Sequence, residues 1–198
     1  TVAAVNDAPT TDDDTASTDE DTAVDISITA SDIEADDVTF SIVSDVSNGT
    51  TSLTDSTVTY TPTANYNGTD TFTYKANDGE DDSNTSTITI TIASVNDAPV
   101  AENVTGSTNE NRMMQLGVTL VATDVDGDDL TYSVVSTNDG SVTVSGSTAT
   151  YTPSANFNGT DTFTYKANDG TVDSNTATAT ITVASVEDTP TTADVSAS

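Results

Sequence analysis

A long stretch of this chain occurs twice, almost without change. Residues 59–79 read TYTPTANYNGTDTFTYKANDG, and residues 150–170 read TYTPSANFNGTDTFTYKANDG. The two copies lie about 90 residues apart, a period that is too long for one turn of a solenoid and suits one small β domain. The sequence therefore predicts an array of equivalent modules, of which two are present here.

A shorter motif marks the boundaries of these modules. VNDAP occurs at residues 5–9 and 95–99, and the related VEDTP occurs at residues 186–190. Each motif is only a few residues long and carries a proline, so a linker of this kind is not a loose tether. We therefore divide the chain into a first module at residues 1–95, a second module at residues 96–186, and a linker with the start of a further module at residues 187–198.

Apolar residues alternate with polar ones throughout both modules, which is the period of a half-buried β-strand. Examples are Phe72, Tyr74 and Ala76 in the first module and Phe163, Tyr165 and Ala167 in the second. Asn-Gly and Asp-Gly turn signals separate the alternating runs, and no stretch has helical periodicity. The pattern predicts an all-β chain: two tandem immunoglobulin-like β-sandwich domains of about seven antiparallel strands each, without a disulfide.

The charge of the chain is strongly acidic. Lys and Arg total 3 against 33 Asp and Glu, for a net charge of −30. Nucleic acid binding requires a basic surface and is not expected. Membrane insertion is not expected either, since no apolar run approaches the length of a membrane span. So many carboxylates on two small domains repel one another unless cations intervene.

Histidine and cysteine are absent from the sequence. Their absence removes the usual general base, disulfide bonds, and the imidazole and thiolate ligands of transition metals. Serine and threonine are abundant, but no residue pattern pairs one of them with an activating base. We therefore expect no enzymatic activity. Lys75 and Lys166 alternate with core-facing neighbours, so we expect them on the outer face of a sheet.

Acidic residues recur at the linker, in the turn after the second strand and in the turn after the sixth strand. In the second module the acidic residues are Asp97, Asp124, Asp126, Asp128 and Asp169, with the amide of Asn96 beside them, and in the first module they are Asp32, Glu34 and Asp78. Alternate turns of a sandwich lie at the same end, so the two turns of a module should meet the linker that enters it. Glu20 and, by its position, Asp70 are expected at the opposite end of the first module, which meets the same linker.

Carboxylate, amide and backbone oxygens in such numbers are the ligands that Ca²⁺ requires, with six to eight per ion. Mg²⁺ fits less well because it retains waters in preference to a crowded protein cage. The alternative interpretation is that these residues are ordinary solvated turns, since Asp, Asn and Gly are favoured in turns without any metal.

Three motifs carry a resemblance to cadherins. ATDVDGDD at residues 122–129, KANDG at residues 166–170 and VNDAP at residues 95–99 resemble the acidic turn, the A-x-D turn and the N-D-x-A-P linker of that family. The chain as a whole resembles the bacterial cadherin-like tandem repeats of very large surface adhesins. The resemblance implies a cadherin-like Ig sandwich with Ca²⁺ bound between successive modules. By position, it implies as ligands Asn96, Asp97, Asp124, Asp126, Asp169 and Glu20.

The sequence departs from the cadherin pattern at three places. The acidic motif before the sixth strand has no clear counterpart, so Asp70 of the Asn-Gly-Thr-Asp segment is assigned by region alone. The first module has Asp32-Ile-Glu34 where the family favours two aspartates. The final linker has Glu187-Asp188 in place of Asn-Asp, which puts the outermost sites in question.

These observations lead us to expect calcium-binding, calcium-rigidified extender repeats of a bacterial adhesin, located at the cell surface, with Ca²⁺ and the neighbouring repeats as partners. Three alternatives remain open. The modules could adhere directly, to carbohydrate or to another cell surface, or homophilically. They could be spacers in a secreted polysaccharide-degrading enzyme. They could also be acidic spacers that serve salt tolerance and bind no specific metal.

Overall fold

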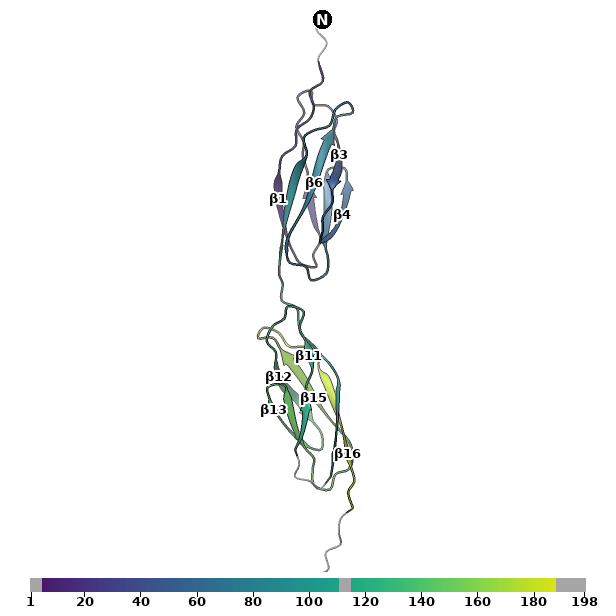
Figure 1. Cartoon of the computed structure of the whole chain (residues 1–198), viewed down its shortest axis with the longest axis vertical. Helices are drawn as coiled ribbons and strands as arrows, with labels where there is room; N and C mark the ends of the chain where they lie inside the picture. The colour runs from purple at the N-terminus through teal and green to yellow at the C-terminus, as the bar shows by residue number, and fades with distance from the viewer. Residues whose placement is uncertain (1–4, 111–114, 188–198) are drawn as a thin grey trace, which may run out of the picture. The chain divides into compact units, whose positions relative to one another are not determined.

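The computed structural model describes residues 5–110 and 115–187 (Figure 1). The chain divides into two compact modules, Thr1–Val95 and Asn96–Ser198, each of which is described by itself. Both are all-β sandwiches, and no helix occurs among the described residues. Accordingly, none of the described residues forms a helix able to cross a membrane. The predicted fold class is confirmed.

The described residues of the first module form seven strands in two sheets. One sheet has the order β1-β7-β6-β3 and the other β2-β5-β4. The strands are β1 (Asp14–Asp19), β2 (Val24–Ser27), β3 (Thr39–Ser44), β4 (Gly49–Thr54), β5 (Thr57–Pro62), β6 (Gly68–Asn77) and β7 (Ser86–Ala93).

The second module repeats this plan. Its sheets have the orders β12-β15-β16-β9 and β10-β14-β13, with a short β11-β8 pair beside them. The strands are β8 (Val100–Ala101), β9 (Val104–Asn109), β10 (Leu116–Thr119), β11 (Ala122–Thr123), β12 (Thr131–Thr137), β13 (Ser141–Ser145), β14 (Thr148–Thr152), β15 (Gly159–Asn168) and β16 (Ala177–Ala184).

The expectation of purely antiparallel pairing is wrong at one edge of each module. β1 pairs with β7 in parallel, and β9 pairs with β16 in parallel. The first and the seventh strand of an up-and-down path run in the same direction. When the sandwich places them side by side, they therefore pair in parallel.

The core follows directly from the alternation of apolar residues. Burial alternates along β6 and along β7, and Phe72, Tyr74, Ile88 and Ile90 are all at most 2% exposed. The second module has the same arrangement around Phe163 and neighbouring side chains. Removal of this apolar surface from water is the dominant stabilising contribution to each module.

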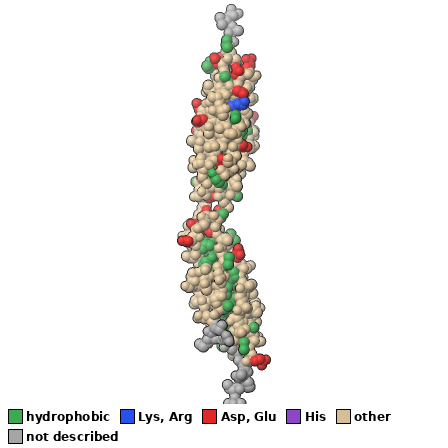
Figure 2. Space-filling view, viewed as in Figure 1, with side chains coloured by type: hydrophobic (Ala, Val, Ile, Leu, Met, Phe, Trp, Pro, Cys, Tyr) green, Lys and Arg blue, Asp and Glu red, His purple; other side chains and the backbone are tan. Residues whose placement is uncertain are grey.

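Threonine and serine occupy most outward positions of the larger sheets. Thr71 of β6 lies opposite Thr89 of β7, and Thr162 of β15 lies opposite Thr180 of β16. Much of the surface seen in Figure 2 is accordingly uncharged, and in the second module the acidic side chains visible there lie towards its ends. The outward threonines and serines thus leave much of these sheet faces uncharged, while many of the acidic side chains lie in turns.

Candidate metal centre

The turn that follows β11 in the second module is built around Asp124. Its Oδ1 accepts hydrogen bonds from the backbone N–H groups of Asp126 at 3.0 Å, Gly127 at 3.1 Å and Asp128 at 3.3 Å. Gly127 has φ of 80°, a left-handed conformation that glycine adopts at little cost. The carboxylates of Asp124, Asp126 and Asp128 each bring an oxygen within 4.8 Å of the others.

The second oxygen of Asp124 has a different environment. Oδ2 is buried and has no hydrogen-bond partner among the described residues. A buried carboxylate oxygen that no donor reaches carries a desolvation cost that a bound cation would remove. The two oxygens of Asp124 therefore differ in role: Oδ1 holds the turn in shape, and Oδ2 is available to a cation.

The linker that enters the second module meets this turn. The backbone N–H of Asp97 donates to Asp126 Oδ2 at 2.7 Å, and Asn96 Nδ2 donates to Asp169 Oδ2 at 2.8 Å. The structure thus brings together, within one module, the predicted residues Asn96, Asp97, Asp124, Asp126, Asp128 and Asp169.

Asp169 lies in the turn between β15 and β16. Its Oδ1 accepts the backbone N–H groups of Thr171 at 2.6 Å and Val172 at 2.7 Å. The hydrogen bond from the Asn96 side chain, supported by these backbone donors, lowers the pKa of Asp169 below its ordinary value. The side chain is therefore a carboxylate at neutral pH, as a cation ligand must be.

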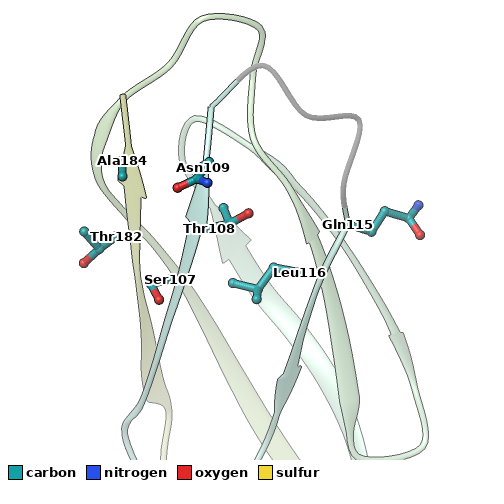
Figure 3. A pocket seen from close by; sticks show the side chains of 7 residues that line it. All are labelled: Ser107, Thr108, Asn109, Gln115, Leu116, Thr182 and Ala184. Carbon is teal, nitrogen blue, oxygen red and sulfur yellow. The ribbon is translucent and has the colours of Figure 1, made fainter. Parts of the chain in front are cut away.

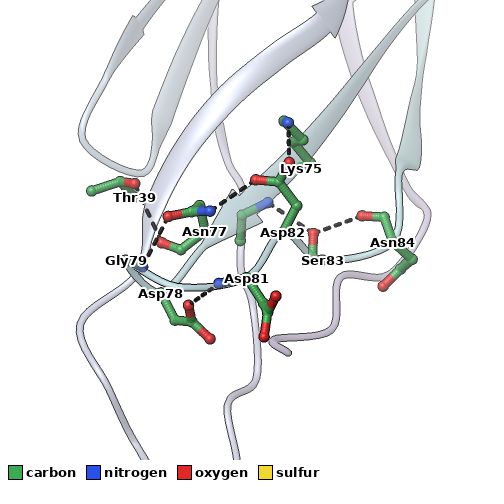
Figure 4. Close-up of polar contacts among 10 residues, drawn as sticks. Thr39, Lys75, Asn77, Asp78, Gly79, Asp81, Asp82, Ser83 and Asn84 are labelled. Atoms are coloured by element: carbon green, nitrogen blue, oxygen red, sulfur yellow. Dashed lines mark hydrogen bonds and ion pairs between the residues drawn. The ribbon is translucent and has the colours of Figure 1, made fainter. Parts of the chain in front are cut away.

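A second network fixes the shape of this kind of turn, and Figure 4 shows it in the first module. Lys75 Nζ pairs with Asp82 Oδ2 at 2.5 Å, and Asn77 Nδ2 donates to Asp82 Oδ1 at 2.9 Å. Asn77 Oδ1 then accepts the N–H of Gly79 at 2.8 Å. The lysine lies on the outer face, as predicted, where it ties the two ends of the turn together.

The second module repeats the network. Lys166 Nζ pairs with Asp173 Oδ2 at 3.2 Å, and Asn168 Nδ2 donates to Asp173 Oδ1 at 2.9 Å. The hydrogen bond from Asn168, followed by that from Lys166, lowers the pKa of Asp173. The position of Asp169 next to Asn168 is thus fixed by hydrogen bonds on both sides of the turn.

The first module has an equivalent arrangement at its N-terminal end. Asn6 Nδ2 donates to Asp78 Oδ2 at 3.0 Å, and the N–H of Asp7 donates to Glu34 Oε2 at 3.3 Å. Asp32 Oδ2 is buried without a hydrogen-bond partner among the described residues, as Asp124 Oδ2 is. The predicted residues Glu34 and Asp78 therefore contact the preceding linker segment, and Asp32 belongs to the same turn as Glu34.

Asn6 and Asp7 were missed as site residues by the sequence prediction. The signal that could have identified them is the VNDAP repeat, since residues 5–9 and 95–99 are identical. Asp81 was also missed. It accepts a second, longer hydrogen bond from Asn6 at 3.3 Å, and its counterpart in the second module is Val172, so no repeat identified it.

Glu20 lies at the opposite end of the first module and is 4% exposed. Its Oε1 accepts the N–H of Val95 at 2.6 Å, where the chain leads into Asn96. The second module has the same contact, because Glu110 Oε1 accepts the N–H of Val186 at 2.9 Å. A buried glutamate therefore anchors the chain where it leaves each sandwich. The structure does not bring Glu20 together with the Asp32 turn of its own module.

Asp70 has a different role from the other predicted residues. It is 4% exposed, and its oxygens accept the N–H groups of Ser47 at 3.0 Å, Asn48 at 2.7 Å and Thr71 at 2.9 Å. Burial by itself would raise the pKa of Asp70, but these backbone donors outweigh burial and leave the pKa lowered. Asp70 is buried, and its hydrogen bonds lead to the Ser47–Asn48 loop and not to the linker or the acidic turns, so we leave it out of the metal centre.

The same buried contact recurs in the second module. Tyr151 donates its hydroxyl to Asp161 Oδ2 at 2.7 Å, as Tyr60 does to Asp70 Oδ2 at 3.3 Å. The signal for this internal role was present in the sequence, because Asp70 lies two residues before Phe72 and so faces the core.

A separate hollow lies between β9 and β10 of the second module (Figure 3). Its lining includes Ser107, Leu116 and Thr182 and no carboxylate. It therefore lacks the charged oxygens that distinguish the turns at the N-terminal end of the module.

A sequence model described as bacterial Ig domain matches this chain twice, over residues 6–91 and over residues 96–182. A search of curated proteins found no match.

Among solved structures, human protocadherin-24 EC1-2 is similar at a TM-score of 0.58 and 17% identity, with 92% of this chain and 100% of that chain covered. Mouse cadherin-23 EC22-24 is similar at a TM-score of 0.56 and 20% identity, covering 90% and 67%. At such identities the likeness shows the fold alone.

An endo-fucoidan hydrolase, MfFcnA4 from glycoside hydrolase family 107, matches at a TM-score of 0.37 and 23% identity, covering 91% of this chain. The chain spans only 29% of that enzyme's length. A likeness this weak carries no argument about function.

Proposed function

The chain belongs to the bacterial Ig domain family, and on this premise we propose that its modules are calcium-binding extender repeats of a bacterial cell-surface adhesin. One observation carries the proposal. The carboxylates of Asp124, Asp126 and Asp128 converge within 4.8 Å, and Asp124 Oδ2 is buried without a hydrogen-bond partner among the described residues.

The donor set favours Ca²⁺ over other metals. Every side chain in the cluster offers oxygen, and the sequence has neither histidine nor cysteine for a softer metal. Asn96, Asp97 and Asp169 add oxygen ligands to the three converging aspartates, which approaches the six to eight that Ca²⁺ takes. Crowded carboxylates also suit Ca²⁺ better than Mg²⁺, which retains bound waters.

The proposed location follows from calcium affinity. Extracellular calcium modules bind with dissociation constants of about 10⁻⁴–10⁻³ M. Such sites fill outside a cell and empty in the cytosol. At a hundredfold excess of Ca²⁺ over the dissociation constant, binding would stabilise a module by about 2.7 kcal/mol.

The mechanical effect follows from which residues share the ion. Asn96 and Asp97 belong to the linker, whereas Asp124, Asp126 and Asp169 belong to turns of the folded domain. An ion bound by both groups would restrict the linker, and its charge would offset the repulsion among the carboxylates. A series of such modules would then stiffen when calcium binds and project a distal binding domain. The contribution of Glu20 from the preceding module stays a prediction.

A calcium titration of the intact chain by isothermal calorimetry tests the proposal. Saturable binding in the millimolar range is expected, and Asp97→Ala combined with Asp126→Ala should abolish it in the second module while the sandwich stays folded. Asp55→Asn, an exposed change in the β4–β5 turn, is the matched control. Heats no different from those of NaCl at equal ionic strength would mean that the acidic turns are only solvated surface.

A further inference from the structure

We infer, on the basis of the proposed calcium function, that the two modules carry unequal sites and that the second module fills first. The difference lies in two neighbouring positions of the acidic turn. The first module has Glu34 and Ala35 where the second has Asp126 and Gly127. These residues set the calcium concentration at which each module binds.

The hydrogen bonding of the two turns differs. In the second module, Asp124 Oδ1 gathers three backbone N–H groups, from Asp126, Gly127 and Asp128. In the first module, only the N–H of Asp36 reaches Asp32 Oδ1 among the described residues, at 3.1 Å. The turn of the second module is therefore closed around its central aspartate, and that of the first module is more open.

The backbone conformation explains part of this difference. Ala35 has φ of 61°, and Gly127 has φ of 80°. A Cβ placed on Gly127 would meet no atom within 4 Å, so glycine supplies conformational freedom there rather than space. An alanine occupies the left-handed region at a cost, so the turn of the first module adopts its binding conformation for a smaller fraction of the time. Affinity falls by that fraction.

The length of the side chain that carries the carboxylate explains the remaining difference between the two turns. Asp126 Oδ2 accepts the N–H of Asp97 at 2.7 Å, whereas Glu34 Oε2 accepts the N–H of Asp7 at 3.3 Å. The longer glutamate side chain must also lose more rotamer freedom to hold a ligand position. Among the described residues, three carboxylates that converge within 4.8 Å occur only in the second module.

One feature of the first module would increase its affinity for calcium. Asp81 adds a carboxylate beside Asp78, and Asn6 Nδ2 donates to both, at 3.0 Å and 3.3 Å. The added negative charge favours a cation, but Asp81 is exposed, and exposed charges are strongly screened. Closure of the turn therefore outweighs the extra charge.

The consequence is a graded response. At intermediate calcium the linker residues Asn96 and Asp97 become ordered while Asn6 and Asp7 are still free of the ion. Turns of the Asp-Gly and Glu-Ala types would then mark joints that stiffen at different calcium concentrations. An array could tune its flexibility by the order in which it uses them.

Calorimetric titration of the intact chain with CaCl₂ tests the inference. Two phases are expected, with dissociation constants that differ by about tenfold. Asp124→Asn should remove the tighter phase and Asp32→Asn the weaker one. Glu34→Asp combined with Ala35→Gly installs the second module's turn in the first and should merge the weaker phase with the tighter.

The possible results of these titrations distinguish the inference from the proposed calcium function. Equal affinities in the unaltered chain, or loss of the weaker phase in Asp124→Asn, would overturn the inference while leaving calcium binding intact. A Glu34→Asp/Ala35→Gly chain whose weaker phase does not move would also overturn it, and this variant introduces no change that should unfold the module. No calcium binding by either module would instead refute the proposed function, and the inference with it.

Discussion

The side-chain amide of Asn96 donates a hydrogen bond to the carboxylate of Asp169 at 2.8 Å, although the two residues lie at opposite ends of the second module's sequence. Asn6 and Asp78 form the same pair in the first module at 3.0 Å. In each module, a hydrogen bond that needs no cation thus attaches the preceding linker to the turn after the long strand, which is β6 in the first module and β15 in the second. The amide N–H occupies one oxygen of the Asp169 carboxylate.

This pair predicts two separable effects of substitution at Asn96. Asn96→Ala removes both the donor to Asp169 and a proposed oxygen ligand, so calcium binding should weaken about tenfold. Asn96→Asp keeps an oxygen ligand but loses the donor. It should retain calcium binding and should loosen the linker only in calcium-free buffer, because two carboxylates then face each other.

Calorimetry measures the affinity of both variants, and amide exchange of residues 96–99 measures the order of the linker. Asn6→Ala is the matched control, since it should leave the second module unaffected. Unchanged linker protection in calcium-free Asn96→Asp would contradict the role assigned to the amide.

Asp70 should make the first module sensitive to acid. Its pKa is lowered in the folded state because backbone N–H donors outweigh burial. A lowered folded pKa stabilises the module fully above the unfolded value of about 3.9, and the contribution is lost as the pH falls through the folded pKa. Asp70→Asn should therefore destabilise the module at pH 7 and should cost progressively less below about pH 4.

Urea unfolding of the unaltered chain and of Asp70→Asn across this pH range checks the prediction. Asp55→Asn serves as the control for the loss of one exposed charge. A difference in unfolding free energy that stays constant down to the lowest pH would show that the Asp70 carboxylate is not the stabilising species.

Tyr60 should make the same module sensitive to alkali. Burial, with the adjacent Asp70 charge, raises the pKa of Tyr60 to about 12. Its contribution to stability is present below the unfolded value of about 10 and is lost as the pH rises through about 12. Tyr60→Phe should cost about 1–2 kcal/mol at pH 7, because the hydroxyl donates to Asp70 in the core.

The alkaline transition can be followed by tyrosinate absorbance together with circular dichroism. In the unaltered chain the last tyrosines should ionise only as the strands unfold. Ionisation of every tyrosine near pH 10 in a folded protein would contradict the buried hydrogen bonds.

Gly140 should be intolerant of any side chain. A Cβ there would lie 2.3 Å from the ring of Tyr151 and 2.8 Å from the carbonyl oxygen of Thr152. Gly140→Ala should therefore destabilise the second module by about 1–3 kcal/mol through overpacking. Gly117→Ala, whose Cβ would make an ordinary contact at 3.6 Å with Thr148, is the matched control. Equal unfolding midpoints for the two variants would contradict the close packing of Tyr151.

Much of the fold could be predicted from the sequence, because the alternation of apolar and polar residues along a strand indicates which side chains are buried. Phe72 and Tyr74 are core residues as predicted. The parallel pairing of β1 with β7 was not predicted, since a local pattern does not encode which distant strand becomes the neighbour. The inward position of Asp70 follows from the same alternation, but its hydrogen-bond partners do not. Its donors Ser47 and Asn48 come from a loop whose path depends on tertiary packing.

The candidate site could be predicted in part. The recurrence of acidic turns, together with the position of alternate turns in a sandwich, was sufficient to place Asp126 and Asp169 beside the linker residues Asp97 and Asn96. Which oxygen of a carboxylate accepts the turn's hydrogen bonds, and which does not, could not be predicted. That Asp124 uses Oδ1 for its own turn and leaves Oδ2 buried depends on side-chain geometry that no spacing specifies.

Small-angle X-ray scattering of the intact chain measures whether calcium stiffens the array. Scattering would be measured in EDTA, in millimolar CaCl₂ and in NaCl of matched ionic strength, for the unaltered chain and for Asp97→Ala/Asp126→Ala. If calcium stiffens the linker, CaCl₂ alone should narrow the distance distribution to that of one shape, and the double variant should lose this response. Identical distributions in the two salts, or a full calcium response in the double variant, would contradict this expectation.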